Sequence, residues 1–183
     1  MYRNILIFIL VLLRFPLINV SSNTDVLDFA GGNGSHERPY LIKTAGQLID
    51  MARKVNDDNA KYGGRCYRLV NDINLVFSTE DDYQPIGNSE SATFTGCFEG
   101  MGKTIRLDIG ANGALYNARK YLGLFGEIDG ACNINRVKVD AHIFASYTVG
   151  DITIKDSIYC GGLAANVIDG KIKKNEIASA IVI

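Results

Sequence analysis

This sequence has no surplus of charge of either sign. Its 183 residues include 19 lysine and arginine residues against 20 aspartate and glutamate residues, which gives a net charge of −1. Proteins that bind nucleic acid or anionic lipid through charge carry a concentrated positive surface, so neither partner is indicated here. Apolar residues make up 47% and charged residues 21% of the chain, which suits one domain with a packed core.

The chain also lacks the common metal and nucleotide motifs. It has four cysteines but no C-x-x-C pair, no H-E-x-x-H motif, and only two histidines, His36 and His142. A zinc site therefore has no ligand spacing to support it. The glycine-rich stretch GGNGS at residues 31–35 precedes a short apolar strand, whereas a phosphate-binding loop leads directly into a helix. We predict a tight turn there, and no metal or cofactor.

The apolar run at the start of the chain is too short to span a membrane. Ile5–Leu13 has nine residues, about half of the roughly 20 that a spanning helix needs. Arg3 precedes the run, and the small residues Val20 and Ser22 follow it, as in a secretory signal. We predict a signal peptide over residues 1–22, with a buried N-terminal strand or helix as the alternative. The remaining chain, residues 23–183, is then exported without a membrane span, into surroundings that permit disulfides.

One long helix is indicated, at about residues 44–56. Thr44 and Gln47 form a T-x-x-Q capping box at its start. Apolar residues then recur on one side of the helix, at Leu48, Met51, Ala52 and Val55. An amphipathic helix of this size is usually a packing element, so we expect it to cover one end of the core.

Beyond the helix the apolar residues follow a period of two. Ile105, Leu107 and Ile109 alternate with polar residues, and Tyr67 and Leu69 do the same. Such alternation predicts half-buried strands. Glycine and Asn/Asp turns separate further short segments of this kind. Because no second long helix is visible, an α/β crossover fold is not indicated.

Two of these segments repeat one another. Asp129-Gly130 and Asp169-Gly170 are turns 40 residues apart, and the Gly-Leu pairs that begin at Gly123 and Gly162 are 39 apart. A period of this length is typical of a solenoid or a propeller. Two repeats are too few for the blades of a propeller, so a β-solenoid is favoured. We expect each repeat to form two β-coils of about 20 residues each.

The chain also resembles the GLUG-motif proteins, a family of exported, adhesin-like bacterial surface proteins. The resemblance is carried by GGNGSHERPYLIKTAGQLIDMARKVN, YRLVNDINL, QPIGNSESATFTGCFEGMGKTIRLDI, YLGLFGEI and GGL, in this order along the chain. It covers residue 29 to the C-terminus. It implies a mainly β fold, a right-handed parallel β-helix whose N-terminal end is covered by the predicted helix, as one domain over residues 23–183.

The motif residues are expected to have structural roles. Phe94, Phe98 and Leu124 would point into the core, and Gly96, Gly100 and Gly102 would permit corners. The full set is Thr44, Gln47, Phe94, Gly96, Phe98, Gly100, Gly102, Gly123, Leu124, Gly126, Gly161, Gly162 and Leu163. The family resemblance supplies no catalytic residue.

The four cysteines divide into two kinds. Cys66 and Cys97 lie out of phase with the apolar residues of their strands, so both should face outward. Neighbouring strands lie roughly 4.8 Å apart, which is within the range for a disulfide. We predict that Cys66 and Cys97 can bridge if their strands are neighbours in register. Cys132 and Cys160 are expected to be more interior and less reactive.

These features favour a non-catalytic protein, secreted or on the cell surface, that acts in binding or adhesion. Its extracellular ligand would be a glycan or a protein. One alternative is a β-helix enzyme acting on polysaccharide, a lyase or hydrolase that uses the acidic cluster Glu80, Asp81 and Asp82. The other is a truncated fragment of a larger surface protein. The sequence ends in the uncharged segment IASAIVI, a strand edge that predicts self-association.

Overall fold

The computed structural model describes residues 29–77, 84–110, 121–144 and 159–182. The predicted signal peptide and the acidic cluster Glu80, Asp81 and Asp82 lie outside these ranges. Within them, no helix is long and apolar enough to cross a membrane. The described chain consists of short strands and one long helix, so the prediction of a mainly β fold is confirmed.

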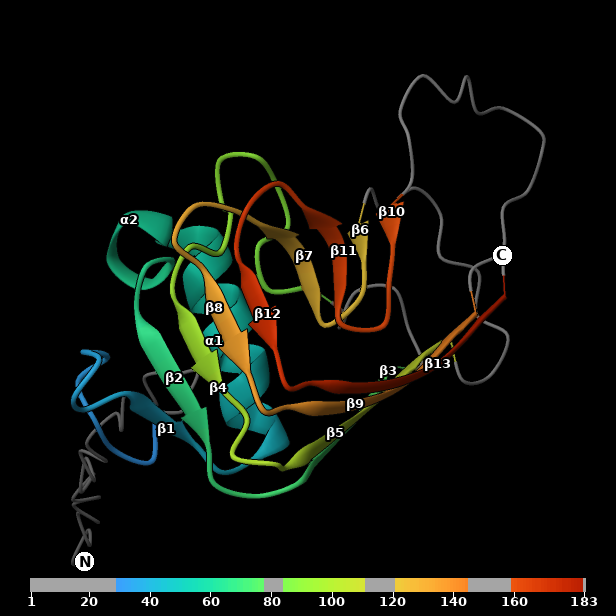
Figure 1. The fold of residues 1–183 in the computed structure, drawn as a ribbon, viewed down its shortest axis with the longest axis horizontal. Helices are drawn as coiled ribbons and strands as arrows, with labels where there is room; N and C mark the ends of the chain where they lie inside the picture. The colour runs from blue at the N-terminus through green and yellow to red at the C-terminus, as the bar shows by residue number, and fades with distance from the viewer. Residues whose placement is uncertain (1–28, 78–83, 111–120, 145–158, 183) are drawn as a thin grey trace, which may run out of the picture.

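The strands form two main sheets and two short pairs, and every ladder between them is parallel. The five-stranded sheet contains, in order, β1 (Tyr40–Ile42), β2 (Cys66–Leu69), β4 (Cys97–Glu99), β8 (Asn133–Asn135) and β12 (Lys171–Lys173). The four-stranded sheet contains β3 (Ile73–Phe77), β5 (Thr104–Ile109), β9 (Lys138–Phe144) and β13 (Glu176–Val182). The pairs are β6 (Tyr121–Leu122) with β10 (Tyr159–Cys160), and β7 (Phe125–Ile128) with β11 (Ala164–Val167). In Figure 1 the five-stranded sheet runs from β1 in blue to β12 in red, in the order of the chain.

The register shows how the two repeats are related. Tyr121 pairs with Tyr159, 38 positions later, and Val139 pairs with Ile177, also 38 positions later. The four strands β6 to β9 thus pair one to one with β10 to β13. The expectation of two coils of about 20 residues in each repeat is therefore wrong. A repeat is a single layer, because each of its strands bonds to the corresponding strand of the next repeat.

The long helix α1 spans Ala45–Asp57, with Thr44 as its N-cap. The Thr44 hydroxyl accepts a hydrogen bond from the Gln47 amide at 3.3 Å, and the Gln47 side chain accepts one from the Lys43 amide at 2.8 Å. The sequence placed this start correctly, because capping depends on residues only three or four positions apart. A short second helix, α2 (Asn59–Tyr62), follows.

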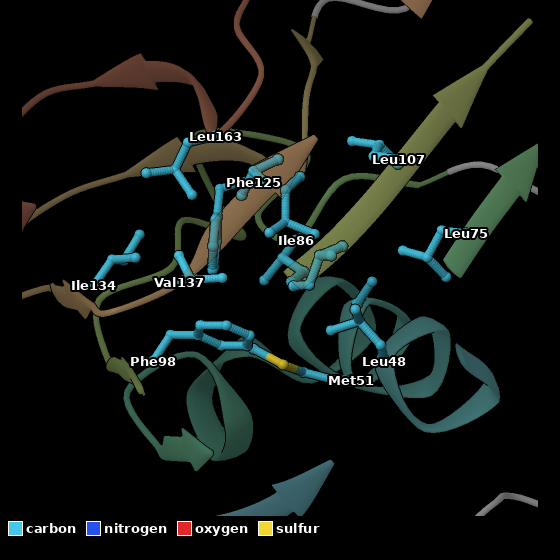
Figure 2. Packing of buried hydrophobic residues seen from close by; sticks show 14 of the residues in the cluster. Leu48, Met51, Leu75, Ile86, Phe98, Leu107, Phe125, Ile134, Val137 and Leu163 are labelled. Carbon is cyan, nitrogen blue, oxygen red and sulfur yellow. The ribbon is translucent and has the colours of Figure 1, made fainter. Parts of the chain in front are cut away.

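Helix α1 covers the end of the fold at which the ladders begin. Leu48 lies beside Leu75 of β3 and Ile86, which are the first members of their ladders (Figure 2). Asn56 of α1 holds the same edge, since its side chain donates to the Pro85 carbonyl at 3.0 Å and accepts from the Gly87 amide at 2.9 Å. The apolar side of α1 is thereby buried against the core.

The core lies between the sheets and α1. Alternate residues of β5 are buried, as the period of two predicts: Ile105, Leu107 and Ile109 are at most 1% exposed. Aromatic rings fill the middle, where the Phe125 ring lies 5.2 Å from Phe94 and 5.4 Å from Phe98 between centroids. Burial of these large apolar side chains is the main contribution to stability.

The glycine-rich stretch is a tight turn before β1. The amides of Asn33 and Gly34 both donate to the Arg38 carbonyl, at 2.9 and 3.1 Å. The Gly34 carbonyl accepts from the Cys66 amide at 2.9 Å, which extends the pairing of β1 with β2. The stretch therefore positions the first strand, in agreement with the sequence prediction.

Candidate binding groove

The apolar motif residues all lie in the core. Phe94 and Phe98 are 0% exposed, and Leu124 and Leu163 are 4% and 3% exposed. Figure 2 shows the Phe98, Phe125 and Leu163 side chains together in the core, where Phe98 comes from β4, Phe125 from β7 and Leu163 from the residues before β11. These positions are therefore packing positions.

Most of the motif glycines lie where another part of the backbone approaches closely. A Cβ added at any of them would lie 2.1–2.4 Å from a backbone atom: Gly96, Gly100, Gly123, Gly126 and Gly161. Gly102 is different, since it has a φ of +73° and open space around it. Gly102 therefore has the conformation expected of a corner residue. At Gly96 and Gly100, by contrast, the close approach of another backbone segment leaves no room for a side chain. Gly162 faces the Ser179 side chain at 3.1 Å.

Gly126→Ala is expected to lower the free energy of unfolding by about 1–3 kcal/mol. Its added methyl group would lie 2.2 Å from the Gly87 carbonyl oxygen, so β7 and the segment at Ile86 and Gly87 must move apart. Gly64→Ala is the matched control, because the nearest atom there is Thr95 Oγ1 at 3.6 Å. We expect the control to change stability by less than about 0.5 kcal/mol. Chemical denaturation of both variants measures this, and equal effects would contradict the packing explanation.

Cys66 and Cys97 form a disulfide on the outer face of the five-stranded sheet. They are direct partners in the register of β2 and β4, with Cα atoms 4.4 Å apart. Cys132 is free and fully buried, and Cys160 is free and half-buried. Burial raises the pKa of the Cys132 thiol to about 12 and also raises that of Cys160, so both thiols are poor nucleophiles at neutral pH.

The outward side chains of this sheet form two rows across the strands. Parallel pairing aligns Cys66, Cys97, Asn133 and Lys171 in one row, and Arg68, Glu99, Asn135 and Lys173 in the other. A hollow of about 140 Å³ lies over β2, β4 and β8, between the disulfide, the second row and His36 at its rim. We call this hollow the disulfide groove; its lining residues are His36, Pro39, Cys66, Tyr67, Arg68, Cys97, Phe98, Glu99, Asn133 and Asn135.

Glu99 is the carboxylate that lines the groove, and hydrogen bonds from neighbouring residues partly satisfy its oxygens. It accepts from Arg136 Nε at 3.0 Å, from Asn135 Nδ2 at 3.3 Å and from the Met101 amide at 3.1 Å. These bonds hold Asn135 with its amide nitrogen toward Glu99, which leaves its oxygen for another partner.

Two buried polar atoms of the groove have no partner among the described residues. They are Arg68 Nε, a hydrogen-bond donor, and Asn135 Oδ1, an acceptor. A buried polar group without a partner costs about 1–3 kcal/mol, so native proteins rarely leave one unpaired. One hydroxyl group of a ligand can accept from Arg68 Nε, and another can donate to Asn135 Oδ1. The groove therefore fits a ligand rich in hydroxyl groups.

The four-stranded sheet carries a second polar cluster on its outer face. Asp108 accepts from Arg106 Nε at 3.1 Å and lies 3.0 Å from His142 Nδ1. Each of its carboxylate oxygens thus has a polar partner, and the cluster is a set of paired side chains rather than a cavity. In the described part of the chain, no group of three or more His, Cys, Asp or Glu residues is arranged to hold a metal.

Glu127 is a buried carboxylate, 3% exposed, on β7. It accepts from Thr93 Oγ1 at 2.9 Å, from the Tyr121 hydroxyl at 2.7 Å and from Asn166 Nδ2 at 3.0 Å. These donors come from three separate segments of the chain. Glu127 therefore joins successive layers, and this role is structural.

Sequence reasoning missed Arg68, Glu99 and Asn135. The sequence does contain a weak indication of these residues. Three triplets share a polar–apolar–polar pattern around a buried residue: Cys66-Tyr67-Arg68, Cys97-Phe98-Glu99 and Asn133-Ile134-Asn135. This pattern predicts that the three residues lie in one row only when the triplets are aligned at spacings of 31 and 36 residues. Those unequal spacings follow from loop lengths, which no local pattern reveals.

No protein family model matches this chain, and no solved structure matches it. Halomucin of Haloquadratum walsbyi is 35% identical over 109 residues, which are 55% of this chain and 1% of that protein. A protein of Evansella cellulosilytica described as a Gly-rich membrane protein is 33% identical over 105 residues, which are 55% of this chain and 11% of that protein. The chain is thus similar to small parts of two much longer proteins.

Proposed function

We propose that this chain is an exported, GLUG-type, right-handed parallel β-helix that binds glycan in the disulfide groove without catalysis. The stacking of one repeat on the next in parallel register, with α1 over one end, supports the β-helix. The names of the two similar proteins, halomucin and a Gly-rich membrane protein, support a location at the cell surface. A disulfide between Cys66 and Cys97 is consistent with export.

The unpartnered donor and acceptor in the disulfide groove are the reason for proposing a glycan as the ligand. Arg68 and Asn135 both line the hollow, and each has a buried polar atom without a partner among the described residues; sugar hydroxyl groups can both accept from a donor such as Arg68 Nε and donate to an acceptor such as Asn135 Oδ1. A hydroxyl-rich ligand gains these bonds without breaking internal ones, which favours its binding over that of an apolar ligand. The rim residues Lys171 and Lys173 extend the polar face along the same rows.

Arg68→Met tests this ligand assignment. A glycan array selects the ligand, and calorimetric titration then compares the variant with the unmodified chain. We expect the dissociation constant to rise about 10-fold to 100-fold, because a hydrogen bond from a charged group contributes about 1.5–3 kcal/mol. Stability should stay equal or rise, since the change removes an unpaired buried donor.

Arg106→Met is the matched control, because it removes the same charge from the four-stranded sheet. It should leave glycan affinity unchanged. Equal weakening by both variants, or no glycan bound by the unmodified chain, would contradict the proposal.

The non-catalytic part of the proposal has a separate test. Mass spectrometry of the bound glycan after prolonged incubation with the chain should find it unchanged. Shortened or unsaturated sugar products would instead identify a polysaccharide hydrolase or lyase.

A further inference from the structure

The last layer of the fold exposes apolar side chains at positions that are buried one layer earlier. Their partners in the preceding strands are Ile128, Ile134, Val139 and Ile143, all at most 2% exposed. The residues that follow them in register are 47%, 40%, 52% and 38% exposed, respectively: Val167, Ile172, Ile177 and Ile181. The interior of the fold is therefore continuous up to this layer, and no described strand pairs beyond it. An apolar surface of this kind marks an interaction site.

No strand within the described residues pairs with the outer edge of β13. The Glu176 amide donates at 3.1 Å to the carbonyl of Val137, the residue before β9, and in a parallel ladder alternate residues bond to the same side. Glu176, Ala178 and Ala180 therefore bond to β9, whereas Ile177, Ser179 and Ile181 direct their backbone groups to the free edge. A free edge of this length is a template for pairing with another strand.

The opposite end of the fold cannot supply the pairing strand. Helix α1 packs there against β3, the first strand of the four-stranded sheet, through Leu48, and its Asn56 side chain bonds to the neighbouring segment at Pro85 and Gly87. Head-to-tail addition along the four-stranded sheet would therefore have to displace α1. A contact between the β13 ends of two copies meets no such obstacle among the described residues.

The sequence of β13 is symmetric. Residues 177–181 read Ile-Ala-Ser-Ala-Ile, which is the same in both directions. If two copies of β13 run antiparallel and cross at Ser179, Ile177 lies opposite Ile181 of the second copy, and Ala178 lies opposite Ala180. No charged residue occurs in this segment, so no like charges meet. A self-complementary patch is what a two-fold interface requires.

We infer that the chain forms a two-fold dimer in which β13 pairs antiparallel with β13 of a second copy, centred on Ser179. Ile177, Ser179 and Ile181 present their backbone groups at the free edge, so the pairing forms about six backbone hydrogen bonds. The contact also buries the Ile177 and Ile181 side chains of both copies. The four-stranded sheet then continues across the dimer.

Sedimentation velocity of the purified chain over a range of concentrations tests the dimer. We expect a monomer–dimer equilibrium for the unmodified chain. Ile181→Lys should raise the dimer dissociation constant by about 100-fold or more, because it places unpaired charges in the apolar contact. Ile49→Lys is the matched control, since Ile49 is similarly exposed, at 42%, but lies on α1. A monomeric unmodified chain, an open-ended polymer, or equal effects of both variants would overturn the inference.

Cysteine cross-linking tests the register without altering the apolar residues. Ser179→Cys should form a disulfide-linked dimer with oxidised glutathione, because opposite residues of a hydrogen-bonded pair have Cα atoms about 5.5 Å apart. Ala178→Cys should not, since its equivalent in the second copy is the diagonal neighbour, at about 7–8 Å. Equal cross-linking of both variants, or of neither, would overturn the pairing centred on Ser179.

Discussion

Replacing Phe98 with alanine is expected to lower the free energy of unfolding by about 3–5 kcal/mol. Phe98 is fully buried and makes an edge-on contact with Phe125. Figure 2 shows its ring between Met51 of α1 and Val137. The side chains around it come from a helix and two sheets, so they cannot all close over the cavity that alanine leaves. Urea denaturation followed by circular dichroism measures the loss.

Phe144→Ala is the control for this prediction. Phe144 is the same residue type near the end of β9, but it is 43% exposed. Its removal should cost less than about 1 kcal/mol, because most of its surface already faces water. If the two variants were equally destabilised, burial of Phe98 could not be the cause.

Removing the Cys66–Cys97 disulfide by the double change Cys66→Ala and Cys97→Ala is expected to cost about 3–4 kcal/mol. The bond joins residues 31 positions apart, and a cross-link over a loop of this length restricts the unfolded chain substantially. Both residues are on the outer face of the sheet, so their replacement leaves the core intact. Thermal unfolding of the double variant should show the loss.

Cys160→Ala provides the comparison, since Cys160 is free and half-buried. It should change stability by less than about 1 kcal/mol. Peptide mapping under non-reducing conditions should recover residues 66 and 97 in one linked species. Two free thiols at these positions would refute both the bond and its stabilising role.

Local features of the fold were predictable from the sequence. The start of α1 follows from Thr44 and Gln47, and the buried positions of β5 follow from the alternation of Ile105, Leu107 and Ile109. Each of these features depends on residues a few positions apart, whose preferences act before any long-range contact forms. The turn at residues 31–35 is of the same kind, because its hydrogen bonds span few residues.

The sequence by itself thus determined the start of the helix, the tight turn, and which residues of strands such as β5 face the interior. Only the tertiary structure decided which strands are neighbours. It showed that one repeat is one layer, and it brought Arg68, Glu99 and Asn135 into one row although 31 and 36 residues separate them. The physical reason is that strand register depends on the lengths of the intervening loops and on packing in the shared core. The local alternation of apolar and polar residues indicates neither the loop lengths nor the core packing. It is the same for every register that keeps one face of the strand buried.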